Sequence, residues 1–285
     1  MEKTRSRAMA APWSYGHPAV PWLYAFTVAV AIGGAFLGSG ALGGTPINEA
    51  SGGWLSADGT VLAPGTGAFS IWSVIYAGLV VHAVIQLVAA WRGTALQCRL
   101  RPWAAASALL NAAWIWAVQW GQLALSVVVI VVLLAVLART FVLFLRTPAS
   151  GRTERLVVGI TFGLYLGWVS VATVANTAAL LASRGARASE GTTAVLAAVV
   201  LAATAAIGVA LAAKTGGRLA PAAALAWGLA WIAVGRLDGG TPSTPIAWSA
   251  GAAAVVVIAG TLLYRVRGTR VPRHQPAGRP DGGRR

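Results

Sequence analysis

Residues Leu156–Ala182 read LVVGITFGLYLGWVSVATVANTAALLA, with no Lys, Arg, Asp or Glu among them. The run exceeds the roughly 20 apolar residues that an α-helix needs to cross the hydrocarbon core of a bilayer. Two stripes recur in it at helical spacing. One carries larger side chains: Tyr165, Trp168, Ala172 and Asn176. The other is glycine: Gly159, Gly163 and Gly167. The stretch therefore predicts a membrane-spanning helix with one aromatic, polar face and one face that another helix can approach closely.

The whole chain has the composition of a membrane protein. Hydrophobic residues make up 57% of its 285 residues, charged residues 10%, and the mean hydropathy is +0.71. Soluble domains carry about 25% charged residues, so this chain lacks the side chains to cover a surface in water. Eight apolar runs are present: Trp22–Leu42, Ala68–Ala90, Trp103–Val118, Leu123–Leu145, Leu156–Ala182, Ala194–Ala213, Leu219–Val234 and Ile246–Tyr264. We expect an all-α, polytopic bundle of about eight transmembrane helices, which excludes soluble enzymes and disulfide scaffolds.

The positive charge is distributed as membrane topology requires. With the N-terminus in the cytoplasm, nineteen of the 22 Lys and Arg residues lie on the inner side, and only Arg184, Arg187 and Arg236 lie outside. The sequence thus predicts a multi-pass protein with both termini cytoplasmic. Arg in place of Lys, with abundant Ala and Gly, indicates the coding bias of a GC-rich bacterium. Because bacterial outer-membrane proteins are mostly β-barrels, the expected helices predict the inner membrane. The net charge of +15 comes without a basic helix or RNA-binding motif, so we expect no nucleic-acid partner.

The apolar runs divide the chain into four segments. We expect a cytoplasmic N-terminal segment at 1–21, a five-helix membrane domain at 22–183, a three-helix extension at 194–264 and a disordered basic tail at 265–285. The connection from Gly43 to Gly67 is the longest outer loop. Loops of this length are often lids or binding elements. The loop containing Trp54 is therefore either a lid or an inert tether.

The chain lacks the residue patterns of most enzymes. All seven carboxylates fall in loops, near span ends or in tails, which weighs against a proton-driven pump. There is no P-loop, no nucleophile motif and no cluster with metal-ligand spacing. His82 stands alone in the second span and is interpreted as a hydrogen-bonded structural residue rather than a haem ligand. We predict no catalytic residue, no metal site, no required cofactor and no enzyme activity.

Aromatic and amide side chains gather in three of the spans. In the second span, Phe69, Trp72 and Tyr76 share one helix face, and in the third Asn111 and Trp114 lie three residues apart. A carboxamide in hydrocarbon is costly unless it is paired, so Asn111 and Asn176 either bond across helices or orient a ligand. If these spans pack together, they enclose an uncharged aromatic cavity that suits a neutral aromatic molecule. The glycine steps, including Gly34 and Gly38, also favour a homodimer.

Together these motifs resemble the tryptophan-rich sensory protein or translocator protein family (TspO/MBR, peripheral benzodiazepine receptor-like). The resemblance covers residues 22–183 and rests on four motifs: Phe69 with Trp72-Ser-Val-Ile-Tyr76, Leu110-Asn111-Ala-Ala-Trp114, Gln119-Trp120-Gly121, and Tyr165-Leu-Gly-Trp168 with Ala172 and Asn176. It implies a five-span core that binds tetrapyrroles or sterols. The implied cavity residues are Trp72, Tyr76, Asn111, Trp114, Tyr165, Trp168, Ala172 and Asn176, closed by the loop that holds Trp54. The last three spans have no counterpart in that family.

The leading hypothesis is a membrane sensor or translocator that holds a neutral aromatic or lipid-like molecule in the five-helix core. Its partners would be the lipid bilayer and this small hydrophobic ligand, with a tetrapyrrole as one candidate. The alternative is a permease, either a secondary carrier or the membrane subunit of an exporter. A third reading is a structural protein whose Trp residues only pack and anchor it.

Overall fold

The computed structural model describes residues 19–40, 43, 45–47, 49–186, 188–238 and 241–269, and every regular element within them is helical. The α-helices are α1 (Ala19–Gly38), α2 (Ile71–Ile85), α3 (Ala89–Arg92), α4 (Ala95–Gln119), α5 (Leu123–Arg146), α6 (Arg152–Ser183), α7 (Glu190–Thr215), α8 (Leu219–Leu237) and α9 (Thr244–Thr269). Two 3-10 helices, η1 (Ser51–Gly53) and η2 (Thr66–Ser70), lie in the first loop. The predicted all-α helix bundle is confirmed.

Among the described residues, the long helices are α1, α2 and α4–α9. Seven are long and apolar enough to cross a membrane, with α2 counted together with η2 as Thr66–Ile85, and α4 is the exception. The exception carries Arg99 and Arg101 in its first turns. It begins at Ala95, eight residues before the predicted start at Trp103, because the Thr94 hydroxyl caps it by accepting from the Gln97 N–H. The predicted span Trp103–Val118 therefore leaves out the polar start of this helix.

The two ends of the bundle also differ from expectation. The first helix begins at Ala19 rather than Trp22, and α9 continues to Thr269, so the residues just after Arg265 are helical rather than part of a disordered tail. The remaining residues of the expected terminal segments, 1–18 and 270–285, lie outside the described residues.

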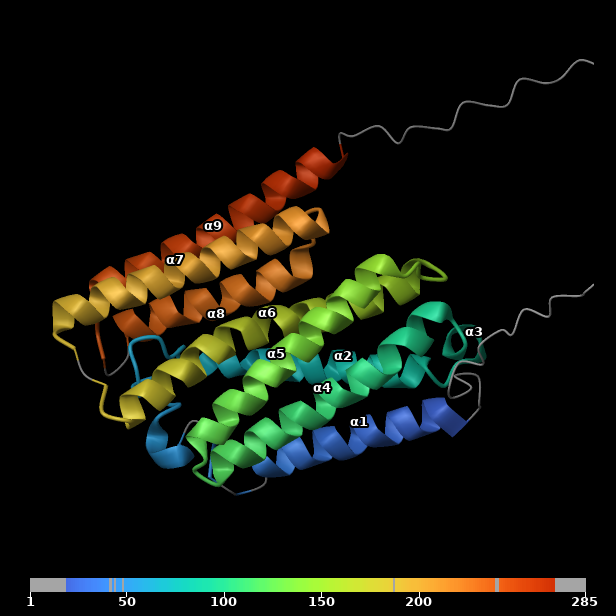
Figure 1. Ribbon diagram of the computed structural model, residues 1–285, viewed down its shortest axis with the longest axis horizontal. Coiled ribbons are helices and arrows are strands. Elements are labelled where there is room, and N and C mark those ends of the chain that lie inside the picture. Colours follow the sequence, from blue (N-terminus) through green and yellow to red (C-terminus); the bar gives the residue numbers. More distant parts are fainter. Residues whose placement is uncertain are drawn as a thin grey trace, which may run out of the picture.

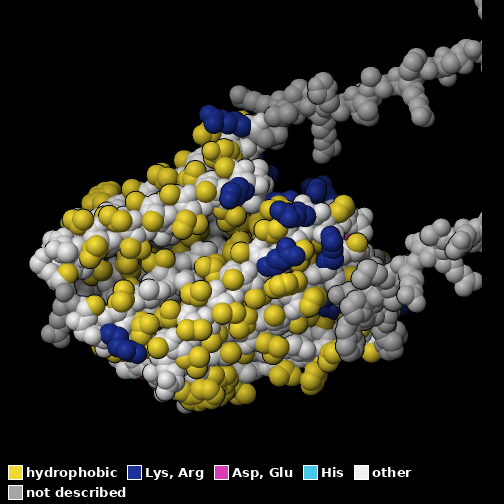
Figure 2. Space-filling model, in the orientation of Figure 1, with side chains coloured by type: hydrophobic (Ala, Val, Ile, Leu, Met, Phe, Trp, Pro, Cys, Tyr) yellow, Lys and Arg dark blue, Asp and Glu magenta, His cyan; other side chains and the backbone are white. Residues whose placement is uncertain are grey.

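Successive long helices run in opposite directions along the bundle, and α6 and α8 pack against each other in its middle. The pair α1 and α4 lies on one side of them and the pair α7 and α9 on the other (Figure 1). Ala19 and Thr269 therefore lie at the same end, which we call the basic end. Lys and Arg side chains gather there, while apolar side chains cover most of the visible face (Figure 2). The opposite end carries the loop between α1 and α2 and is called the loop end.

The glycine stripe of α6 lies against α8. A Cβ atom at Gly167 would stand 2.1 Å from the carbonyl oxygen of Pro221, and one at Gly163 would stand 2.8 Å from the Cβ of Ala220. The side chain of Val171 on α6 likewise packs directly against Gly228 of α8. Only glycine allows the two backbones to come this close, so the stripe decides where α8 sits.

The glycines of α1 are likewise used within the chain. A Cβ at Gly38 would stand 2.7 Å from the Ile115 side chain of α4, and Gly34 faces the indole of Trp116 at 3.9 Å. Both glycine stripes thus pack against helices of the same chain. These glycines therefore do not support contact with a second copy of the chain. The homodimer stays a prediction.

We expect Gly167→Ala to lower the free energy of unfolding by about 1–3 kcal/mol, because the added methyl group collides with the backbone of α8. The matched control is Gly33→Ala in α1, where a Cβ meets nothing within 4 Å. It should leave stability unchanged or slightly raised, as the better helix former replaces glycine. Thermal unfolding of both variants in detergent measures the difference. Equal midpoints would contradict the packing role of the α6 stripe.

Candidate functional site

Aromatic side chains from four elements meet near the loop end. The Trp72 ring of α2 stacks on Trp114 of α4, with centroids 6.2 Å apart and planes inclined by 27°. It meets Trp168 of α6 edge-on, at 6.2 Å and 87°. Phe69 of η2 completes the group with an edge contact to Trp168 at 6.0 Å. Offset stacks and edge contacts at these distances are the favourable arrangements for aromatic rings, so the cluster is a well-packed unit.

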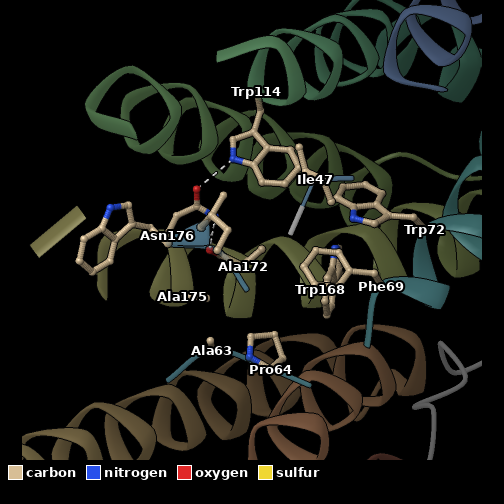
Figure 3. A pocket seen from close by; sticks show the side chains of 12 residues that line it. Ile47, Ala63, Pro64, Phe69, Trp72, Trp114, Trp168, Ala172, Ala175 and Asn176 are labelled. Carbon is tan, nitrogen blue, oxygen red and sulfur yellow. Dashed lines mark hydrogen bonds between the residues drawn. The ribbon is translucent and has the colours of Figure 1, made fainter. Parts of the chain in front are cut away.

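A small closed cavity lies beside this cluster. Its volume is about 20 Å³, which is room for about one water molecule. The first loop, η2, α2, α4 and α6 all contribute to its wall (Figure 3). The lining residues are Ile47, Trp54, Leu55, Ala63, Pro64, Phe69, Trp72, Trp114, Trp168, Ala172, Ala175 and Asn176. The wall is almost entirely apolar, with the Asn176 amide and the indole N–H groups as its main polar atoms.

The buried amides are mostly paired with protein groups. The Asn176 oxygen accepts from Trp114 Nε1 at 3.1 Å and from Ser126 Oγ at 3.3 Å, as the dashed line in Figure 3 shows for the indole. Asn111 Nδ2 donates to the Tyr76 hydroxyl at 2.9 Å. Around the aromatic cluster, two buried side-chain atoms have no hydrogen-bond partner: Trp168 Nε1 and Asn111 Oδ1. The first belongs to a residue that lines the cavity.

The structure brings together most of the residues that the sequence singled out. Those lining the cavity are Trp72, Trp114, Trp168, Ala172 and Asn176. The other three lie one helical turn closer to the basic end: Tyr76, Asn111 and Tyr165. The two tyrosines pack against the cluster on the side of the basic end. The Tyr76 ring stacks on Trp72 with centroids 5.4 Å apart, and Tyr165 makes an edge-to-face contact with Trp72 at 5.8 Å. Their roles toward a ligand stay predictions.

The first loop folds over the cavity. Trp54 lines it and is 36% exposed, and its ring also borders an outer polar depression of about 280 Å³ that Ser51 and Gln122 help to line. The Ser51 hydroxyl donates to the Val118 carbonyl at the end of α4, at 2.5 Å. Leu55 is buried beside Trp54. The loop is therefore a packed part of the wall, and Trp54 separates the cavity from the outside.

Comparison with known protein families identifies the family of this chain. Residues 22–263 match the family described as TSPO-like protein, which is most of the chain. The chain belongs to this family. No curated protein and no solved structure matches it. The matched range includes α7, α8 and most of α9, so the family extends over the three C-terminal helices that the resemblance to five-span proteins did not reach.

A second buried cluster of this TSPO-like protein lies at the basic end. The Tyr24 hydroxyl bonds His82 Nδ1 at 2.7 Å, and His82 Nε2 bonds the Gln97 oxygen at 2.9 Å. Gln97 Nε2 in turn donates to Glu154 Oε1 at 3.0 Å. Both nitrogens of His82 are thus engaged by protein groups, as expected of a structural histidine. The chain of bonds ties α1, α2, α4 and α6 together.

Glu154 is fully buried in the first turn of α6. Its Oε1 also accepts from the Thr94 hydroxyl at 2.6 Å, and its Oε2 accepts from the N–H and the hydroxyl of Ser150 at 2.5 and 2.8 Å. Four donors therefore satisfy the carboxylate. On the other side of the cluster, Arg101 donates to the Gln86 oxygen at 2.8 Å and to the Arg92 carbonyl at 2.6 Å.

Sequence reasoning missed this cluster. Glu154 was assigned to the region of the loops, and the polar residues before Trp103 were left outside the span. The available signal was spacing: His82 with Gln86, and Gln97 with Arg101, each lie four residues apart and so share a helix face.

Glu154→Gln should lower the free energy of unfolding by about 1–3 kcal/mol, because one carboxylate oxygen becomes an NH₂ group facing donors. Glu190→Gln is the matched control, since Glu190 stands in the first turn of α7 and is exposed. It should change stability little. The two variants are compared by thermal unfolding of the purified protein. If both behave as the parent does, Glu154 does not hold the basic end together.

Proposed function

We propose that this TSPO-like membrane protein binds a neutral planar aromatic or lipid-like small molecule, of the tetrapyrrole or sterol type, between Trp72, Trp114 and Trp168. One observation carries the proposal. Indoles from three helices meet at an apolar cavity beneath a loop, and the buried N–H of Trp168 has no hydrogen-bond partner there. A buried donor without a partner is costly, so a ligand that accepts from it gains affinity.

The chemistry of the wall favours an uncharged ligand. Flat apolar molecules gain stacking and burial against Trp rings, whereas an ion would lose its hydration without a counter-charge. No Asp, Glu, Lys or Arg belongs to the lining among the described residues. The described lining also lacks His, Cys, Met and Tyr, the usual axial ligands of haem iron. The apolar macrocycle of a metal-free tetrapyrrole fits this set better than haem does. Ionised propionate groups, such as the two of protoporphyrin IX, would have to stay in the outer polar depression that Arg184 helps to line.

The present volume implies that the site opens to bind. Pockets for drug-sized ligands enclose about 300–1,000 Å³, whereas this cavity encloses about 20 Å³. The lining residues of the loop, among them Trp54, Leu55 and Pro64, would have to move outward and the indoles would have to separate. The structure thus corresponds to a closed form, with Trp54 at the entrance from the outer depression.

We infer that the basic end faces the cytoplasm and that the membrane is a bacterial inner membrane. The positive-inside rule supports this orientation, since the exposed side chains of Lys214, Arg265 and Arg267 stand at the same end as Ala19. The cavity then lies toward the outer leaflet, where an apolar ligand dissolved in the bilayer reaches it.

A permease is the second candidate, and Glu154 is the observation that favours it. Buried ionisable residues inside a membrane bundle often mark ion pathways. A pH gradient that drives protoporphyrin IX accumulation into proteoliposomes, and fails to do so in Glu154→Gln, would support a carrier. Saturable binding without accumulation would support a receptor. The Gln97 amide between His82 and Glu154 favours the receptor, because an amide is a poor link in a proton relay.

Trp168→Phe should weaken binding of protoporphyrin IX about tenfold, because a smaller aromatic ring remains while the N–H donor and part of the stacking surface are lost. Its fold should survive, since this N–H bonds no protein group. The matched control is Trp248→Phe on α9, where the side chain is 75% exposed. The Soret band of the bound porphyrin, titrated against purified protein, gives both affinities. Identical affinities for parent and both variants would remove Trp168 from the site.

A further inference from the structure

The second half of the first loop is bound to α8. Arg236, in the last turn of α8, is 1% exposed although it carries a charge. Its guanidinium donates to the Thr60 carbonyl at 3.1 Å, to the Ala57 carbonyl, and to the Thr241 hydroxyl in the α8–α9 connection. Carbonyl groups that receive a charged donor are held more firmly than by neutral hydrogen bonds. The loop turn at 57–60 is therefore fixed from α8.

Two tryptophans of α8 hold the end of the same loop. The Gly65 N–H donates to the Trp231 carbonyl at 2.9 Å. The Trp231 ring lies so close to Gly67 that a Cβ there would stand 2.1 Å from it. One turn earlier on α8, Trp227 Nε1 donates to the Ala68 carbonyl at 3.0 Å. All three contacts fall within four residues of Phe69, which lines the cavity.

The loop also joins the two hydrophobic clusters of the molecule. Ala50 and Leu55, in its first half, belong to the cluster of the five N-terminal helices. Leu62, in its second half, belongs to the cluster formed mainly by α7, α8 and α9. The cavity-lining residues Trp54 and Pro64 stand within two residues of these anchors. The loop thus covers the cavity and is anchored at both sides. Its first half packs on the N-terminal helices, and its second half is bound to α8.

We propose that α8 is the support that keeps the cavity closed, with Arg236 and Trp231 as positioning residues, and that ligand exchange requires residues 57–68 to leave α8. This inference rests on the proposed function only for the chemical class of the ligand that enters the cavity. The three C-terminal helices then have a defined task, since they place α8 where it can hold the loop. A five-helix bundle alone has no such support.

The test uses Arg236→Gln in the full chain, which removes the charge and shortens the reach to Thr60 and Ala57. The matched control is Arg267→Gln, the same substitution at an exposed site on the basic end of α9. The first readout needs no ligand. Hydrogen–deuterium exchange of the purified protein should be about tenfold faster for the amides of residues 57–68 in Arg236→Gln, because local opening controls their exchange. The control should exchange as the parent does.

The second readout follows protoporphyrin IX by stopped-flow absorbance at its Soret band. Loosening the lid lowers the barrier to both entry and exit, so the association and dissociation rates should each rise several-fold in Arg236→Gln. The affinity should change less than either rate, which distinguishes a positioning residue from one that contacts the ligand. Faster hydrogen exchange of the loop in a protein that binds no porphyrin would support the α8 contact and refute a tetrapyrrole as the ligand.

Gly67→Ala provides an independent disruption, because the added methyl group pushes the loop off the Trp231 ring. It should accelerate exchange of residues 57–68 as Arg236→Gln does, and it tests the proposal even where Arg236→Gln fails to fold. Unchanged exchange of the loop in every folded variant of Arg236 and Gly67 would overturn the proposal. Equal acceleration by Arg267→Gln would do the same, because the effect would not come from the loop contact.

Discussion

The close approach of Gly167 to the Pro221 carbonyl is the contact on which the rest of the arrangement depends. Because no Cβ separates α6 from α8, α8 packs on the five-helix core at backbone distance. That position brings Trp231 and Arg236 within reach of the first loop, which they hold by its backbone. The loop in turn closes the aromatic cavity. A single stripe of small residues thus connects helix packing to the state of the site.

The two ends of the bundle are stabilised by different means. At the basic end, buried polar groups bond one another in a network from Tyr24 to Glu154, beside which Arg101 Nη1 has no hydrogen-bond partner. Such a network is rigid, because each lost bond leaves a buried group unpaired. At the loop end, rings pack around an apolar cavity and the Trp168 N–H is left without a partner. Rings that lack directional bonds to one another can separate at lower cost. The basic end is therefore held by directional bonds that the rings of the loop end do not form with one another.

Much of the fold followed from local sequence patterns. Apolar runs predicted the eight long helices. The three- and four-residue spacing within each span placed Trp72, Trp114 and Trp168 on stripes that would enclose a cavity if the spans packed together. The same reasoning failed where polar residues lie inside the bundle. Arg236 reads as a loop charge and Glu154 as a surface carboxylate, because nothing local reveals that distant backbone groups will bond them. Trp231 has no local partner either, since Gly65 and Gly67 lie far away in the chain.

The most direct test of the account is an experimental structure of the full chain solved with protoporphyrin IX at saturating concentration. The account predicts planar density between the rings of Trp72, Trp114 and Trp168, with residues 57–68 displaced from α8. Porphyrin bound elsewhere, for example in the open groove of about 660 Å³ that residues of α7 and α9 line, with the aromatic cluster still closed, would contradict it.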